Sequence, residues 1–126
     1  MAKTLCKILG VVMLLVGIAG FFKHDLLGAH LTPMHNIVHL LTAAIALYIG
    51  FSGTANAARS FCLIFGAIYL LLGICGFISP GTVASLIGHQ LSATDSLTPD
   101  NAIHVVLGGV FLVAGLLRAP QPAPTT

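Results

Sequence analysis

Charged residues are scarce in this chain. Lysine, arginine, aspartate and glutamate make up only 6% of its 126 residues, whereas 57% are hydrophobic and the mean hydropathy is +1.05. Soluble domains carry about 25% charged residues, and a soluble fold of this length could not bury so much apolar surface. The composition therefore excludes a water-soluble globular domain and predicts an integral membrane protein surrounded by the lipid bilayer.

Other features are missing too, and each absence excludes a class of protein. The sequence has no basic stripe with interleaved aromatic residues, so we expect no binding of nucleic acid. It has no nucleophile–base set, no paired carboxylates and no phosphate loop, so we expect no enzymatic activity. The three cysteines lack the spacing of a metal site. The alternation with a period of two that a membrane barrel requires is also absent.

Four long apolar stretches account for most of the chain. They span residues 5–22, 33–51, 61–78 and 99–117. A helix needs about 17–25 residues to cross the hydrocarbon core of a bilayer, and the backbone in lipid must satisfy its own hydrogen bonds. We therefore predict an all-α fold, a bundle of four transmembrane helices.

The sequence contains an internal duplication. Cys6, Gly10, Gly17, Gly20 and Phe21 recur 56 positions later as Cys62, Gly66, Gly73, Gly76 and Phe77. Thr32, Pro33, Asn36 and His39 recur as Thr98, Pro99, Asn101 and His104. We predict two tandem helical-hairpin repeats, at about 5–52 and 61–117, related by a pseudo-twofold axis along the membrane normal. Because residues 5–22 match an internal segment, we interpret them as retained and not as a cleaved signal peptide.

The charges differ between the two ends of the predicted bundle. One end holds Lys3, Lys7, Arg59 and Arg118, and the other holds Lys23, Asp25, Asp95 and Asp100. The positive-inside rule then predicts a multi-pass protein with both termini in the cytoplasm. We expect residues 1–118 to form a single membrane domain and the proline-rich residues 119–126 to form a disordered tail.

Each predicted helix carries two small residues seven positions apart, which favours close helix packing. These pairs are Gly10 and Gly17, Ala43 and Gly50, Gly66 and Gly73, and Gly108 and Gly115. Thr32 and Thr98 are the predicted helix caps, each followed by proline at the first helical position.

An Asn-x-x-His element lies near the start of the second helix of each repeat. Asn36 and His39, like Asn101 and His104, are three residues apart and so share a helix face. The same face carries the small residues, so we expect both histidines to point into the bundle and to face each other near its outer surface. His35 lies within reach of this face. Polar groups inside a membrane bundle are candidates for function, and these five residues form the candidate site.

Four interpretations of this site are open. In the first, the asparagines and histidines bond across helices in a structural or partner-binding subunit, whose partner is a second copy or another membrane protein. In the second, His39 and His104 are the core ligands of copper or zinc, with His35, His30 or His89 above them. The third is bis-histidine haem binding, and the fourth is proton-linked or ion-linked transport.

Two further expectations concern the outer loops. Asp95 and Asp100 are interpreted as solvated acids of the long loop and of the start of the last helix. Residues 83–87 are expected to lie along the membrane surface.

Two motifs carry a resemblance to a known family. These are Gly-x-x-Gly-Phe at residues 17–21 and 73–77, and Asn-x-x-His at residues 36–39 and 101–104. Together they resemble a bacterial family of small four-helix membrane proteins that is catalogued as a domain of unknown function. The resemblance extends to about Arg118. It implies four membrane helices and a location in the bacterial inner membrane, and it implies no activity, cofactor or catalytic residue.

Overall fold

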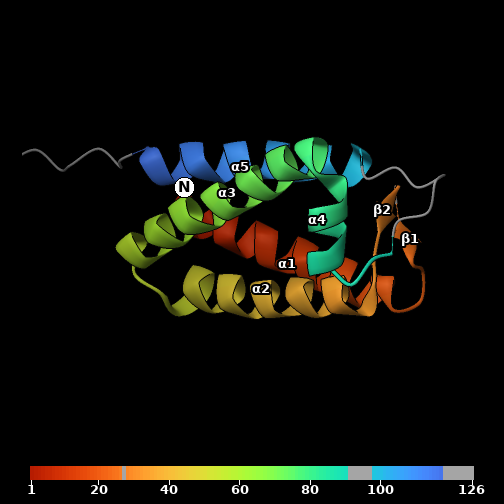
Figure 1. Ribbon diagram of the computed structural model, residues 1–126. Helices are drawn as coiled ribbons and strands as arrows, with labels where there is room; N and C mark the ends of the chain where they lie inside the picture. The colour runs from red at the N-terminus through yellow and green to blue at the C-terminus, as the bar shows by residue number, and fades with distance from the viewer. Residues whose placement is uncertain (27, 91–97, 118–126) are drawn as a thin grey trace, which may run out of the picture.

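The structure is a bundle of four long helices with a cap of short elements at one end (Figure 1). It is a computed structural model that describes residues 1–26, 28–90 and 98–117, with only the backbone described for Thr98. The predicted tail at 119–126, Arg118, Asp95 and the capping side chain of Thr98 lie outside what is described.

The long helices are α1 (Ala2–Gly20), α2 (Pro33–Ser52), α3 (Ala55–Ile78) and α5 (Thr98–Leu116). By length and composition, each is able to cross a membrane. They contain nearly all of the four predicted spans, although α3 begins at Ala55 and not at residue 61. The prediction of a four-helix membrane fold is confirmed.

Threonine caps start two of these helices. The hydroxyl oxygen of Thr32 accepts a hydrogen bond from the backbone N–H of His35 at 3.1 Å, as predicted, and Pro33 occupies the first helical position. Thr54 accepts in the same way from the backbone N–H of Ala57 at 3.1 Å. The cap on α2 fixes where the helix begins, and thereby the depth of the Asn-x-x-His element below it.

Each half of the chain folds back on itself as a hairpin. The first hairpin pairs α1 with α2, and the second pairs α3 with α5. The two hairpins meet through α1 and α3 in the middle, while α2 and α5 lie on opposite outer sides (Figure 1). This is the predicted arrangement of two tandem repeats.

Equivalent residues of the two repeats meet where α1 contacts α3. The sulfur atoms of Cys6 and Cys62 are 4.0 Å apart, and both residues are fully buried. Nearby, the hydroxyl of Tyr69 donates to the sulfur of Met13 at 3.9 Å, and these two residues also occupy one repeat position. A residue can touch its own equivalent only at the axis that relates the copies. The pseudo-twofold axis therefore runs between α1 and α3.

Glycines allow the two helices of each hairpin to touch. A Cβ atom added at Gly66 would lie 2.6 Å from the backbone nitrogen of Leu112, and one at Gly108 would lie 2.4 Å from that of Leu70. Lipid supplies no hydrophobic force between helices, so close packing of this kind must hold them together. The small residues spaced by seven thus form the interfaces within the hairpins.

The cap lies at the end of the bundle opposite to the N-terminus, and we call it the loop end (Figure 1). It contains the antiparallel two-residue strands β1 (Asp25–Leu26) and β2 (Ala29–His30) and the short helix α4 (Pro80–Leu86). Val83 and Ala84 of α4 are buried in the protein. Two residues of the segment expected along the membrane surface therefore face the interior instead.

Candidate functional site

Two side chains hold the peptide groups of His30 from opposite repeats. The backbone N–H of His30 donates to Oδ2 of Asp100 at 3.0 Å, and Nδ1 of His35 donates to the carbonyl oxygen of His30 at 3.0 Å. His35 and Asp100 are equivalent residues, because each directly precedes the asparagine of an Asn-x-x-His element. We call this arrangement the His30 clamp. The clamp holds β2 at the loop end of the bundle, because it links this strand to both α2 and α5.

The position of Asp100 corrects the interpretation of this residue as a solvated acid. Its side chain is buried, with 6% of its surface exposed. The carboxylate is held inside because the backbone N–H of His30 satisfies it, and a buried charged group requires such a partner. The sequence offered one signal for this role, since Asp100 aligns with His35 in the duplication.

Three imidazole rings and one phenol cluster below the clamp. The ring of His35 lies 4.3 Å from that of His39 and 6.1 Å from that of His104. The ring of Tyr69 lies 4.8 Å from that of His104. His35 thus lies close to both of the histidines that were expected to face each other. Tyr69 was not predicted as a residue of the site. It occupies the same repeat position as Met13, and this correspondence was a signal in the sequence that could have identified it.

Hydrogen bonds to backbone carbonyls determine the tautomers of two of these rings. Nδ1 of His104 donates to the carbonyl oxygen of Asp100 at 2.7 Å, and Nδ1 of His35 donates to that of His30. A carbonyl oxygen can only accept, so Nδ1 carries the proton and Nε2 is the acceptor in each neutral ring. His39 is also buried, and its Nδ1 has no partner among the described residues.

A cavity of about 250 Å³ lies beside these rings. Among the described residues its lining is apolar except for the three histidines, Tyr69 and Asp100. The apolar part comes from α1, α5 and the segment around β1 and β2: Val12, Met13, Val16, Leu26, Ala29, Leu31, Ile103 and Leu107. The site is therefore a mostly apolar chamber in which hydrogen-bonding atoms come from one small cluster of side chains.

The two asparagines of the candidate site lie within the hairpins. A Cβ atom added at Gly20 would lie 2.0 Å from Oδ1 of Asn36, and one at Gly76 would lie 1.9 Å from Oδ1 of Asn101. Each asparagine therefore packs against a glycine of the partner helix, in equivalent positions of the two repeats. Asn101 also borders a small cavity of about 30 Å³ near α4, together with His35 and His104. Neither asparagine lines the larger cavity.

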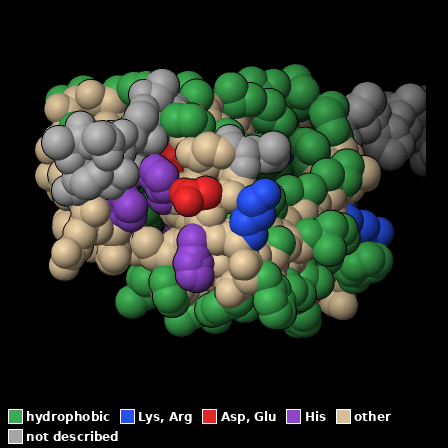
Figure 2. Space-filling model, turned by 90° about the vertical axis from the view of Figure 1, so that its right-hand side faces the viewer, with side chains coloured by type: hydrophobic (Ala, Val, Ile, Leu, Met, Phe, Trp, Pro, Cys, Tyr) green, Lys and Arg blue, Asp and Glu red, His purple; other side chains and the backbone are tan. Residues whose placement is uncertain are grey.

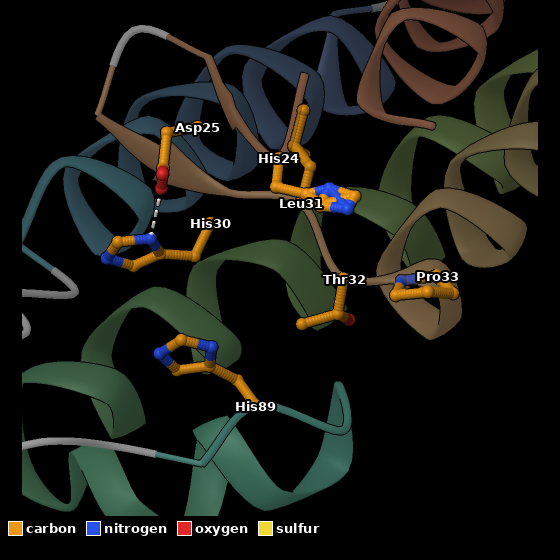
Figure 3. Close-up of a pocket in the computed structure, with 7 residues that line it drawn as sticks. All are labelled: His24, Asp25, His30, Leu31, Thr32, Pro33 and His89. Carbon is orange, nitrogen blue, oxygen red and sulfur yellow. Dashed lines mark hydrogen bonds and ion pairs between the residues drawn. The ribbon is translucent and has the colours of Figure 1, made fainter. Parts of the chain in front are cut away.

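A second hollow of about 340 Å³ opens on the outside of the loop end. Figure 2 shows this face, where histidine, aspartate and lysine side chains gather amid the apolar surface of the helices. In Figure 3 the ring of His30 lies between Asp25 and the ring of His89. Nδ1 of His30 donates to Oδ1 of Asp25 at 2.6 Å, and the rings of His30 and His89 are stacked with 4.8 Å between their centres. The outer loops of both repeats thus meet at His30.

Metal ligation was one of the open interpretations. Within the described residues, no group of three or more histidine, cysteine, aspartate or glutamate side chains is arranged to hold a metal ion. His39 and His104 border the same cavity and so remain two candidate ligands. The structure brings together His35, His39 and His104 from the predicted set. It places Asn36 and Asn101 within the hairpins, against Gly20 and Gly76.

Comparison with known proteins gives one family. The family described as "Domain of unknown function (DUF4383)" matches residues 3–117, so the chain belongs to it. The resemblance found in the sequence is thereby confirmed. No curated protein and no solved structure matches the chain.

Proposed function

We propose that this member of the family is a structural or partner-binding subunit of the bacterial inner membrane, without catalytic activity of its own. The observation that carries the proposal is the His30 clamp, in which equivalent residues of the two repeats bind the two peptide groups that flank His30. The protein has few polar residues. In this proposal, the buried polar residues of the clamp hold the loop end closed and keep the two hairpins in register. The interior polar site would then have a structural purpose.

The outward surface of the helices supports the partner-binding part of the proposal. In each of the four candidate membrane spans only 33% of an apolar 18-residue window is buried inside the chain. The remaining apolar side chains face lipid or the helices of a partner. We propose that the partner is a second copy of the chain or another membrane protein, and that both termini lie in the cytoplasm.

Photo-crosslinking in native membranes tests this function. A photoreactive amino acid is placed at Val106 or at Leu71, which are exposed on α5 and α3, and membranes are irradiated before solubilisation. We expect one discrete protein adduct at one of these positions, identified by mass spectrometry as the chain itself or as a partner. The control position is Asn56, which is exposed in the first turn of α3. If only lipid adducts form at Val106 and Leu71, the partner-binding function is wrong.

A second candidate function is the binding of copper, zinc or haem by His39 and His104. It is favoured by the three imidazole rings on one cavity and by Nδ1 of His39, which has no partner in the described part of the chain. Imidazole is a good ligand for each of these groups. Two histidines do not complete the coordination of a metal ion. The remaining ligands would have to come from the haem itself, from His35 or from solvent.

Elemental analysis and a visible spectrum of the purified protein test this candidate. Stoichiometric metal or a haem absorption band should be present in the wild type and lost in the His39→Ala, His104→Ala double variant. The control is His24→Ala, because His24 is exposed and lies at the outer hollow. Absence of both signals from protein purified without chelators would exclude the cofactor, and the structural proposal would stand.

A further inference from the structure

The cavity beside the histidines is lined by hydrogen-bond acceptors, and one buried ring nitrogen of this cluster has no partner among the described residues. Nε2 of His35 and of His104 is an acceptor, because Nδ1 of each ring donates to a backbone carbonyl. His39 is 6% exposed, and its Nδ1 has no partner among the described residues. Buried polar atoms are nearly always satisfied in folded proteins. A ligand hydroxyl could donate to the Nε2 acceptor of His35 or of His104, and its oxygen can also accept a hydrogen bond.

The rest of the cavity selects against a charged ligand. The carboxylate of Asp100 is the one charged group in its described lining, and it already accepts a hydrogen bond from the backbone N–H of His30. The other lining groups around it are mainly aliphatic. Burial of an unpaired charge there would be costly. The ligand that fits is therefore neutral, apolar over most of its surface, and equipped with a donor at one end.

The cavity reaches the lipid-facing surface between α1 and α5. Val12 of α1 and Ile103 of α5 both line it, and they are 44% and 41% exposed on the outside of the bundle. These helices belong to different hairpins, so the close glycine packing that seals each hairpin does not act here. Val83 and Ile87, in contrast, border the small cavity of about 30 Å³. The larger cavity is thus the one that opens toward the acyl chains of the bilayer.

The volume of the cavity limits the size of the part of the ligand that can enter it. A cavity of about 150 Å³ in another protein holds a benzene ring, and this one measures about 250 Å³. It has room for one six-membered ring with a short substituent. A longer apolar chain would extend through the opening between Val12 and Ile103 into the bilayer.

We propose that the cavity binds a lipid-soluble phenol or alcohol, which enters from the bilayer between α1 and α5 and donates its hydroxyl hydrogen to the histidine cluster. The hydroxyl end lies against His39 and His104, and the apolar body lies between Val16 and Leu107. This ligand class goes beyond the structural and metal-binding functions above, and the proposal depends on neither of them.

Binding of a radiolabelled alkylphenol to the protein in lipid nanodiscs tests the proposal. The probe is para-nonylphenol, and its methyl ether is the competitor that has the same shape without the donor. Empty nanodiscs correct for partition into lipid. We expect saturable binding of one phenol per chain and about tenfold weaker binding of the ether, because one buried hydrogen bond is lost. Equal affinity for the two compounds, or no saturable binding, would overturn the proposal.

Variants at the opening locate the site without disturbing the core. Ile103→Trp places a large ring at the opening and should abolish saturable phenol binding. Val106→Trp lies on the same helix, is exposed and does not line the cavity, so it should bind as the wild type does. His104→Phe keeps a ring but removes the acceptor, and should reduce the preference for phenol over ether. Unchanged phenol binding in Ile103→Trp would also overturn the proposal.

Discussion

The carboxylate of Asp100 accepts a hydrogen bond from the backbone N–H of His30, a residue 70 positions earlier in the chain. The bond links the start of α5 in the second repeat to β2 in the first. His35 completes the link by donating to the carbonyl oxygen of the same residue. The connection between α1 and α2 is thereby anchored to both halves of the molecule, and this has consequences for stability.

Asp100→Asn should destabilise the protein. The amide keeps the size of the side chain but replaces a charged acceptor, and the loss of a buried charge-assisted hydrogen bond costs about 1–3 kcal/mol. The free energy of unfolding, measured by circular dichroism in a titration with denaturing detergent, provides the check. The control is Asp25→Asn, whose side chain is 71% exposed and whose effect should stay below about 0.5 kcal/mol. Equal effects of the two substitutions would contradict the clamp.

Gly66→Ala should weaken the second hairpin. The added methyl group would meet the backbone nitrogen of Leu112 at 2.6 Å, and backbone atoms cannot rotate away as a side chain can. Overpacking of this kind costs about 1–3 kcal/mol. Gly109→Ala is the matched control on α5, because a Cβ atom there has nothing within 4 Å among the described atoms. The same detergent titration should show a clear loss for the first variant and little or no loss for the second.

Oxidation should join Cys6 to Cys62. Their sulfur atoms are 4.0 Å apart, whereas a disulfide requires about 2.05 Å, so a shift of the two side chains brings them into bonding distance. In a Cys75→Ser background, treatment of membranes with a membrane-permeant oxidant should protect both thiols from alkylation after denaturation. The same treatment of a Cys62→Ser, Cys75→Ser variant should leave Cys6 reactive. Full alkylation of both cysteines after prolonged oxidation would contradict the contact between α1 and α3.

The loop end should face away from the cytoplasm. Lys3, Lys7 and Arg59 lie at the other end of the bundle, and positive charge is retained on the cytoplasmic side. In a protein whose three cysteines are replaced by serine, Gln90→Cys should react with a membrane-impermeant maleimide on intact cells. Asn56→Cys should react only after permeabilisation. Reaction of Asn56→Cys in intact cells would reverse the proposed topology.

The duplication carried much of the information that the sequence held about the site. Alignment of the repeats placed His39 with His104 and Asn36 with Asn101, and the three-residue spacing put each pair on one helix face. The alignment also paired His35 with Asp100, but their chemistry differs, so the sequence alone gave no reason to expect both to grip one residue. Long-range bonds such as those to His30 depend on how a loop folds over the bundle, and no periodicity records that.

The distance between His39 and His104 illustrates a second limit. Helix geometry predicts which face a residue occupies, but the separation of two faces depends on the side chains that lie between them. Here the ring of His35 lies close to both histidines, 4.3 Å from His39 and 6.1 Å from His104. The asparagines, in turn, fit against Gly20 and Gly76 because glycine leaves room for an amide there. Such packing is a property of two surfaces together, so neither sequence segment contains it.

The sequence by itself determined the four apolar helices, their pairing into two repeats and the family, because helix length, hydropathy and duplication are local or linear properties of the chain. Only the tertiary structure decided that Cys6 meets Cys62 on the axis, that Asp100 is buried, and that a cavity opens between α1 and α5. These features arise where segments far apart in the sequence come within a few ångströms, and the energetics of close contact decide which atoms meet.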